Sequence, residues 1–225
     1  MSHKILVLNP GSTSTKAAVY EDEHPLMLKS IGHTNQDLSP YPALNDQLDY
    51  RVALVRSWLA QEGFDLTQLS AVVGRGGIIP NIVAGGYVVD DNLNDCLLHH
   101  TVFDHASNLG GLMAREFAEP LRIPAYIYDA VTSDELPPEA RTSFCHVLNA
   151  RATSHKYAQA MGRKYEDMNL VVAHLGGGIS ISAHSHGRII DSVSDDAGPF
   201  SPDRAGSLNM LYVVDLCYSG KYTKK

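Results

Sequence analysis

Residues 170–183 have the sequence LVVAHLGGGISISA, which joins an apolar run, three consecutive glycines and a strictly alternating segment. The apolar run 170–175 is typical of a buried strand, and the alternation in 179–183 is typical of a strand with one buried face. The glycines predict a tight turn whose backbone can come close to an anion. The stretch therefore predicts a β-hairpin with an anion-binding loop at Gly176, Gly177 and Gly178.

The beginning of the chain follows the same plan. An apolar strand at 5–8 is followed by the polar segment 9–16, NPGSTSTK, and by a second short strand at 17–20. Because small and hydroxyl residues donate readily to phosphate oxygens, this turn predicts a second anion-binding loop. Its donors would be Asn9, Gly11, Ser12, Thr13, Ser14 and Lys16. Two such hairpins indicate a pair of related lobes with a phosphate chain held between them; a hydroxyl-rich turn and a β-bulge are the simpler alternatives.

Apolar runs and helical spacing predict alternating strands and helices elsewhere: helices at 51–60, 107–117 and 147–161, and strands at 69–73, 124–128 and 188–191. Residues 184–187, which include His184 and His186, are expected to form an exposed turn. Pro137 and Pro138 predict a connector, because proline removes a backbone donor and disfavours helix before it. We place a first lobe at 1–148 and the start of a second at 149–225.

Composition excludes several classes of protein. With 25 acidic against 18 basic residues the net charge is -7, which argues against neutralising the phosphates of a nucleic acid. No apolar run approaches the roughly 20 residues that span a bilayer, and the first residues turn polar too early for a secretory signal. Three widely spaced cysteines predict neither a disulfide framework nor a zinc site. We therefore expect a cytoplasmic protein with no membrane and no nucleic-acid partner.

Several single residues are candidates for chemistry. His174 precedes the glycine turn and is placed to donate to a phosphoryl oxygen, although a buried core histidine is the alternative. Arg75 and Arg204 lie in glycine-flanked loops, where they are candidates for carboxylate or phosphate clamps, with surface ion pairs as the simpler alternative. Asp129 ends a strand and is a candidate for holding Mg²⁺ or for capping a turn. P-loop, dinucleotide-binding and protein-kinase signatures are absent.

Residues 6–16 and 172–180 together resemble the two signatures of the acetate and butyrate kinase family. The segments GRGG at 74–77, HASNLG at 105–110 and GPFSPDR at 198–204 resemble butyrate kinases rather than acetate kinases. The resemblance implies an α/β fold, the duplicated ribonuclease-H-like fold of actin, Hsp70 and sugar kinases. It also implies transfer of a phosphoryl group between ATP and butyrate, or another short-chain fatty acid, with Mg²⁺, and a homodimer or higher homo-oligomer.

Carried over motif by motif, the resemblance assigns a role to each candidate residue. Asn9 and the hydroxyls of Ser12 to Ser14 would contact phosphate and metal, and Asp129 would lie near Mg²⁺ or the acyl carboxylate. Arg75 and Arg204 would neutralise the carboxylate and the phosphoryl group, and His174 would donate to the phosphoryl oxygens. His105 with Asn108 would line the acyl pocket.

The resemblance also implies a chain roughly one and a half times as long, since both lobes of such a kinase need sheet and helices. We therefore expect the second lobe to be incomplete, which leaves open whether these 225 residues are active. A non-catalytic anion-binding protein of the same fold is one alternative, and a sugar kinase or chaperone ATPase fragment is another.

Overall fold

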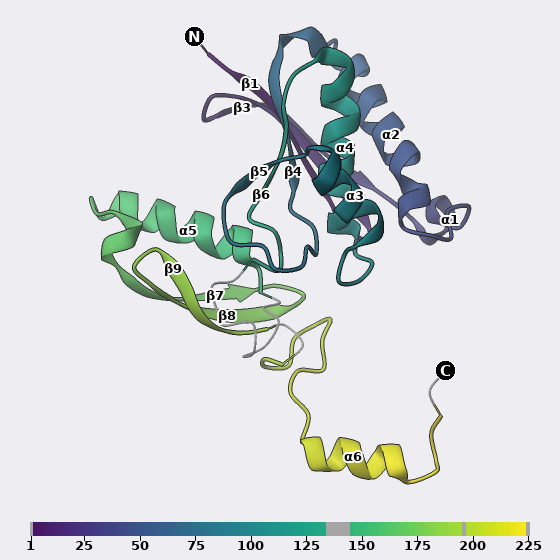
Figure 1. Cartoon of the computed structure of the whole chain (residues 1–225), viewed down its shortest axis with the longest axis vertical. Helices are drawn as coiled ribbons and strands as arrows, with labels where there is room; N and C mark the ends of the chain where they lie inside the picture. The colour runs from purple at the N-terminus through teal and green to yellow at the C-terminus, as the bar shows by residue number, and fades with distance from the viewer. Residues whose placement is uncertain (1, 134–144, 195–196, 224–225) are drawn as a thin grey trace. The chain divides into compact units, whose positions relative to one another are not determined.

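A computed structural model describes residues 2–133, 145–194 and 197–223 (Figure 1). Its contacts divide the chain into two compact units, residues 1–133 and 134–225. The boundary predicted at 148 lies inside helix α5 (Val147–Ala160), which packs on strand β7 (Asn169–Leu175) and belongs to the second unit. The predicted connector at Pro137 and Pro138 lies outside the described residues.

The first unit is built on a six-stranded sheet with the order β3-β2-β1-β4-β6-β5. Its strands are β1 (Lys4–Pro10), β2 (Ser14–Glu21), β3 (His24–Gly32), β4 (Leu69–Arg75), β5 (Gly86–Val88) and β6 (Ala125–Tyr128). Strands β1, β2 and β3 form an antiparallel meander, whereas β1, β4 and β6 run parallel to one another. The carboxyl ends of these three parallel strands therefore meet at one edge of the sheet.

The α-helices of the first unit are α1 (Asn35–Leu38), α2 (Leu48–Gln61), α3 (Asp91–His99) and α4 (Leu109–Ala118), accompanied by short 3₁₀ helices η1 (Asn45–Gln47), η2 (Leu66–Gln68), η3 (Ala106–Asn108) and η4 (Glu119–Leu121). Helix α4 packs directly on β1, β4 and β6, and α2 packs on α4 (Figure 1). The helices predicted at 51–60 and 107–117 are confirmed as α2 and as η3 with α4.

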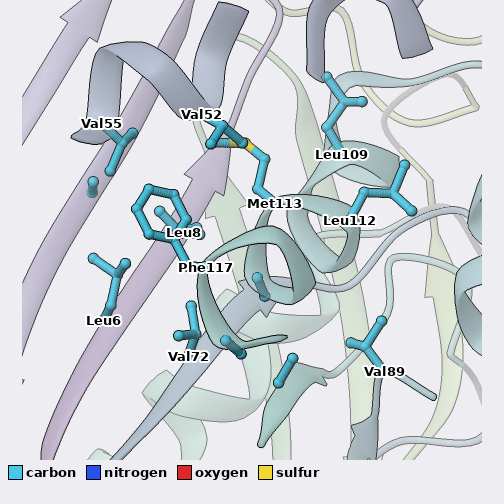
Figure 2. Close-up of a cluster of buried hydrophobic side chains, with 14 of the residues drawn as sticks. Leu6, Leu8, Val52, Val55, Val72, Val89, Leu109, Leu112, Met113 and Phe117 are labelled. Atoms are coloured by element: carbon cyan, nitrogen blue, oxygen red, sulfur yellow. The ribbon is translucent and has the colours of Figure 1, made fainter. Parts of the chain in front are cut away.

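The apolar core of the first unit fills the space between the sheet and these helices (Figure 2). Leu6 and Leu8 of β1 are fully buried, and Phe117 of α4 and Val55 of α2 lie in the same cluster. Burying such a side chain contributes about 1.5–3 kcal/mol. This layer of packing fixes the sheet edge on which the candidate residues lie.

Helix α4 approaches strand β4 so closely that their backbones touch. A Cβ atom added to Gly74 would lie 2.0 Å from the carbonyl oxygen of Gly110, and one added to Gly110 would lie 2.3 Å from the carbonyl oxygen of Arg75. Real Cβ atoms do not make such contacts, so both positions require glycine. The end of β4, where Arg75 lies, is thus anchored by backbone contact.

The second unit contains α5, the 3₁₀ helix η5 (Tyr165–Asp167), a three-stranded antiparallel sheet and α6 (Met210–Tyr218). The sheet has the order β7-β8-β9, with β8 at Ile179–Ser185 and β9 at Arg188–Val193. This meander repeats β1-β2-β3, as the two similar hairpins predict. Helix α6 contains no buried residue. No helix in the described part of the chain combines the length and apolar character needed to cross a membrane.

Two expectations from sequence are corrected. The first turn is only Gly11 to Thr13, since Asn9 and Lys16 pair with each other on β1 and β2. His184 is not exposed: it lies on β8 with 2% of its surface accessible, because hydroxyl side chains around it satisfy its ring. The turn is made by His186 and Gly187, which have positive φ angles of 50° and 75°. Elements β3, α3 and α6 were not predicted.

Candidate functional site

The parallel strands of the first unit bring three predicted residues to one sheet edge. Leu8 of β1 is paired with Gly74 of β4, and Arg75 is paired with Tyr128 of β6. Asn9, Arg75 and Asp129 therefore stand at the carboxyl ends of three adjacent strands. Ligands of open α/β sheets bind at this edge, in the crevice outside the carboxyl ends of the strands.

Arg75 is half-buried at this edge, and no described residue serves as its counter-ion. Among the residues that the structure describes, its guanidinium has no hydrogen-bond or ion-pair partner. Burial lowers the pKa of Arg75, with no nearby charge to offset it. Because an arginine remains charged in proteins, this group is a cation suited to a carboxylate or phosphate.

Asp129 is fixed in a left-handed backbone conformation with φ of 42° and is 2% exposed. Its Oδ1 accepts a hydrogen bond from the amide of Gly85 at 2.9 Å, and its own amide donates to the carbonyl of Gly85 at 3.0 Å. Non-glycine residues in this region of φ are strained by about 1–3 kcal/mol and occur often at functional sites. The candidate role of Asp129 stays a prediction, with its carboxylate held at the sheet edge.

The hairpin loop of the first unit presents hydroxyl groups to solvent. Ser12 and Thr13 are exposed, and the loop is closed by a 2.7 Å hydrogen bond from the Gly11 amide to the Ser14 carbonyl. Asn9 and Lys16 line a hollow of about 440 Å³ on the sheet face beside this loop. The predicted phosphate contacts of the loop are thus on accessible side chains.

The other motifs of the first unit support the loop that carries Arg75. Asn108 is 1% exposed, and its carboxamide accepts from the Ile78 amide at 2.8 Å and donates to the Phe103 carbonyl at 3.0 Å. His105 caps η3, with its Nδ1 2.7 Å from the Ser107 hydroxyl. Asn108 therefore bridges two backbone segments, and the acyl-pocket role of both residues stays a prediction.

In the second unit, His174 is positioned next to the glycine turn. It pairs across the hairpin with Ser180, and its ring stacks on that of His146 with centroids 3.6 Å apart and planes inclined by 8°. His146 Nδ1 lies 2.9 Å from the Ser180 hydroxyl. The loop after the strand is closed by its own backbone, with the Gly176 amide donating to the Gly178 carbonyl at 3.1 Å.

The segment that carries Arg204 folds over this glycine turn. The Ser201 hydroxyl and the Asp203 amide donate to the Gly177 carbonyl at 2.7 and 2.9 Å. A Cβ atom on Gly177 would lie 2.0 Å from an Asp203 carboxylate oxygen. Arg204 is exposed and donates to the Asp203 carbonyl at 3.1 Å. The structure thus brings together the predicted glycine loop and the predicted arginine segment.

Sequence reasoning missed three residues that support these loops. His146 carried no signal beyond being polar, and Asp203 lies in the segment GPFSPDR, of which only Arg204 was singled out. Arg51 did carry one, because it lies four and seven residues before Val55 and Trp58, on the apolar face of the predicted helix. A charged residue on that face marks a buried polar contact rather than a solvated side chain.

The chain is similar over its whole length to proteins named probable butyrate kinase. The one from Clostridium botulinum (strain Alaska E43 / Type E3) is 41% identical over 235 residues, covering 100% of this chain and 66% of that protein. Probable butyrate kinase 2 of Caldanaerobacter subterraneus subsp. tengcongensis is 44% identical over 230 residues, covering 98% and 65%. The chain thus spans just under two thirds of these relatives. No protein-family model matches the sequence.

Two solved structures share the fold at low identity. Acetate kinase from Porphyromonas gingivalis has a TM-score of 0.72 and 18% identity, covering 98% of this chain and 65% of that one. A propionate kinase from Francisella tularensis subsp. tularensis SCHU S4 has a TM-score of 0.61 and 17% identity, covering 98% and 66%. The predicted α/β class and its duplicated ribonuclease-H-like plan are therefore confirmed.

Proposed function

Because the chain belongs to the acetate and butyrate kinase family, we propose that it carries the phosphoryl-transfer site of a butyrate kinase. The reaction passes a phosphoryl group between ATP and butyrate and yields butanoyl phosphate and ADP. The names of the relatives at 40–44% identity support this substrate class. A homo-oligomeric state stays a prediction of the resemblance, and a cytoplasmic location stays a prediction of the sequence.

One observation carries the proposal: Arg75, whose guanidinium is without a partner in the described part of the chain, ends the strand between those that lead to Asn9 and Asp129. An uncompensated cation in such a position attracts an anionic substrate. Its planar fork matches two oxygens of a carboxylate or phosphate.

The chemistry needs little from the protein beyond positioning and charge. The butyrate carboxylate is ionised at neutral pH, so one of its oxygens forms a bond to the γ-phosphorus without a strong base. The bond from that phosphorus to the bridging oxygen breaks, and its electron pair leaves with ADP. Arg75, His174 and Arg204 would stabilise charge on the phosphoryl oxygens, which is the main source of catalysis in phosphoryl transfer.

The residues at the sheet edge fit a magnesium ion carried by a nucleotide. Asn9 and Asp129 offer oxygen donors, which Mg²⁺ prefers, and Mg²⁺ is usually held by one or two carboxylates together with waters and phosphates. The described residues contain no cluster of three or more metal-binding side chains. Asn9 and Asp129 would therefore hold the ion jointly with ATP, and the bound metal would neutralise phosphate charge.

The test is acyl hydroxamate formation by the chain with ATP, Mg²⁺ and butyrate, compared with Arg75→Ala. We expect Arg75→Ala to lower kcat/KM for butyrate at least about a hundredfold, the usual effect of removing one group that stabilises developing charge. Arg122→Gln is the matched control, because Arg122 is an exposed cation that precedes the amino end of β6.

Equal turnover by wild type and Arg75→Ala would overturn the assigned role. If wild type gives no transfer, calorimetry with butyrate and butanoyl phosphate decides between the alternatives. Anion binding that Arg75→Ala abolishes would identify a non-catalytic anion-binding protein, and the kinase proposal would be rejected.

A further inference from the structure

We propose that Arg51 is a positioning residue for the phosphate-binding loop 11–13. It holds the Gly11 carbonyl toward the protein interior, and it places a positive charge beneath the loop. The inference rests on the proposed function of that loop. It concerns a residue of α2 that is remote in sequence from the loop and that no motif includes.

Arg51 is a buried cation without a counter-ion. Its side chain is 1% exposed, and among the described residues no carboxylate lies within ion-pair distance of it. Burying an unpaired charge is costly unless polar groups surround it. The hydrogen bonds of Arg51 must therefore compensate for the cost of burying its charge.

Those hydrogen bonds join helix α2 to the loop. Nη1 donates to the Gly11 carbonyl at 3.0 Å and to the Thr15 hydroxyl at 2.9 Å. Nε and Nη2 both donate to the Gln47 side chain, at 3.2 and 2.9 Å, which fixes the guanidinium plane from the other side. The guanidinium thus connects the loop to the first turns of α2.

The contacts of the loop with Arg51 and His33 are made by carbonyl oxygens of the loop. Besides Gly11, the Thr13 carbonyl accepts from the His33 amide at 2.8 Å, and the Ser14 carbonyl accepts from the Gly11 amide at 2.7 Å. In a trans peptide the carbonyl and the following N–H point in opposite directions. The amide of Ser12 therefore points away from Arg51, and that of Ser14 away from His33.

This orientation makes the loop one-sided. In the described part of the chain, the amides of Ser12 and Thr13 donate to no protein group, and both side chains are exposed. Successive amides that point the same way form a concave site for anions. Without Arg51, the Gly11 peptide could turn over and present its carbonyl oxygen, which repels phosphate.

Of the two basic side chains that contact the loop and Thr15 in the described residues, only Arg51 is charged. His33 Nε2 lies 2.8 Å from the Thr15 hydroxyl, and both side chains are buried. Burial and the neighbouring Arg51 lower the pKa of His33, with Asp37 opposing them, so the ring is neutral at pH 7. Replacing Arg51 with a neutral residue therefore removes the positive charge that these described side chains place under the loop.

The experiment measures binding of inorganic tripolyphosphate to the 225-residue chain by calorimetry, together with the amide resonances of Ser12 and Thr13. Arg51→Gln removes both the positive charge and the planar guanidinium, whereas Arg51→Lys keeps the positive charge but loses the guanidinium. Arg56→Gln is the control: Arg56 lies on the same helix, donates to the Glu116 carbonyl at 2.8 Å and stacks on Phe117, so its loss affects packing away from the loop. Binding is compared at temperatures where each variant is folded.

We expect Arg51→Gln to weaken tripolyphosphate binding at least about tenfold, Arg51→Lys to fall between it and wild type, and Arg56→Gln to bind as wild type does. The Ser12 and Thr13 resonances should shift in both Arg51 variants. Unchanged affinity in Arg51→Gln, or no binding by wild type, would overturn the inference. Arg51-dependent binding without transfer to butyrate would uphold it and reject the kinase proposal.

Discussion

Acidification is expected to destabilise the second unit through one buried histidine. His184 is 2% exposed, with Nδ1 2.5 Å from the Tyr165 hydroxyl and Nε2 2.7 Å from the Ser182 hydroxyl. Burial, and then the charge of Arg151, lower the pKa of His184 from 6.5 to about 4. The folded unit therefore favours the neutral ring.

The sign and size follow from linkage. Between pH 6.5 and 4 the His184 side chain is protonated in the unfolded chain but neutral in the folded unit. The contribution of the neutral ring to the free energy of unfolding is therefore present in full above pH 6.5 and is lost as the pH falls. At pH 5 the loss relative to pH 7.5 is about 2 kcal/mol, and below pH 4 it levels off near about 3 kcal/mol.

The assay is amide hydrogen exchange of β7 to β9, corrected for the intrinsic pH dependence and expressed as an opening free energy. We expect His184→Asn, which cannot take up a proton, to lose about 2 kcal/mol less than wild type between pH 7.5 and pH 5. His186→Asn, in the exposed turn, should behave as wild type does. The same pH slope in wild type and His184→Asn would refute the reasoning.

Two further predictions concern the first unit, measured by urea denaturation followed by circular dichroism. Gly110→Ala should destabilise it by about 3 kcal/mol, because the new Cβ would collide with the Arg75 carbonyl. Gly32→Ala is the control: a Cβ there would meet no atom within 4 Å, so the free energy of unfolding should change by less than about 0.5 kcal/mol. Equal effects of the two substitutions would contradict the collision at Gly110. Asn108→Ala should cost about 1–3 kcal/mol because it leaves the buried Ile78 amide without its acceptor, and an unchanged midpoint would show that this bond contributes nothing.

The sequence predicts most of the architecture because its strongest patterns are local. The glycine turn at 176–178 and the polar turn near residue 11 are flanked by apolar strands, and both appear as hairpins in the structure. Strand β3 escaped prediction because its buried pattern is weak: most of its residues are exposed. Helix α6 has the sequence MLYVVDLCY, which is apolar on all sides except at Asp215, so no apolar stripe stands out against polar positions.

The candidate site was predictable in its residue types but not in its support. The position of Arg75 followed from the end of a strand, whereas the buried state of the His184 ring depends in part on Tyr165, which lies 19 residues earlier in the chain and meets it only after folding. Long-range partners of this kind leave no spacing in a single sequence. Arg51 is the exception, since its place on an apolar helical face could have revealed it.

The contact between Gly74 and Gly110 bears on how such a sequence can change over time. Because one backbone rests on another, the position of Arg75 depends on no particular rotamer or side-chain volume. Cores tolerate exchange of hydrophobic residues when total volume is kept. Substitutions can therefore accumulate in the surrounding core without displacing the sheet edge. This accords with the fold shared with the Porphyromonas gingivalis acetate kinase at 18% identity and a TM-score of 0.72.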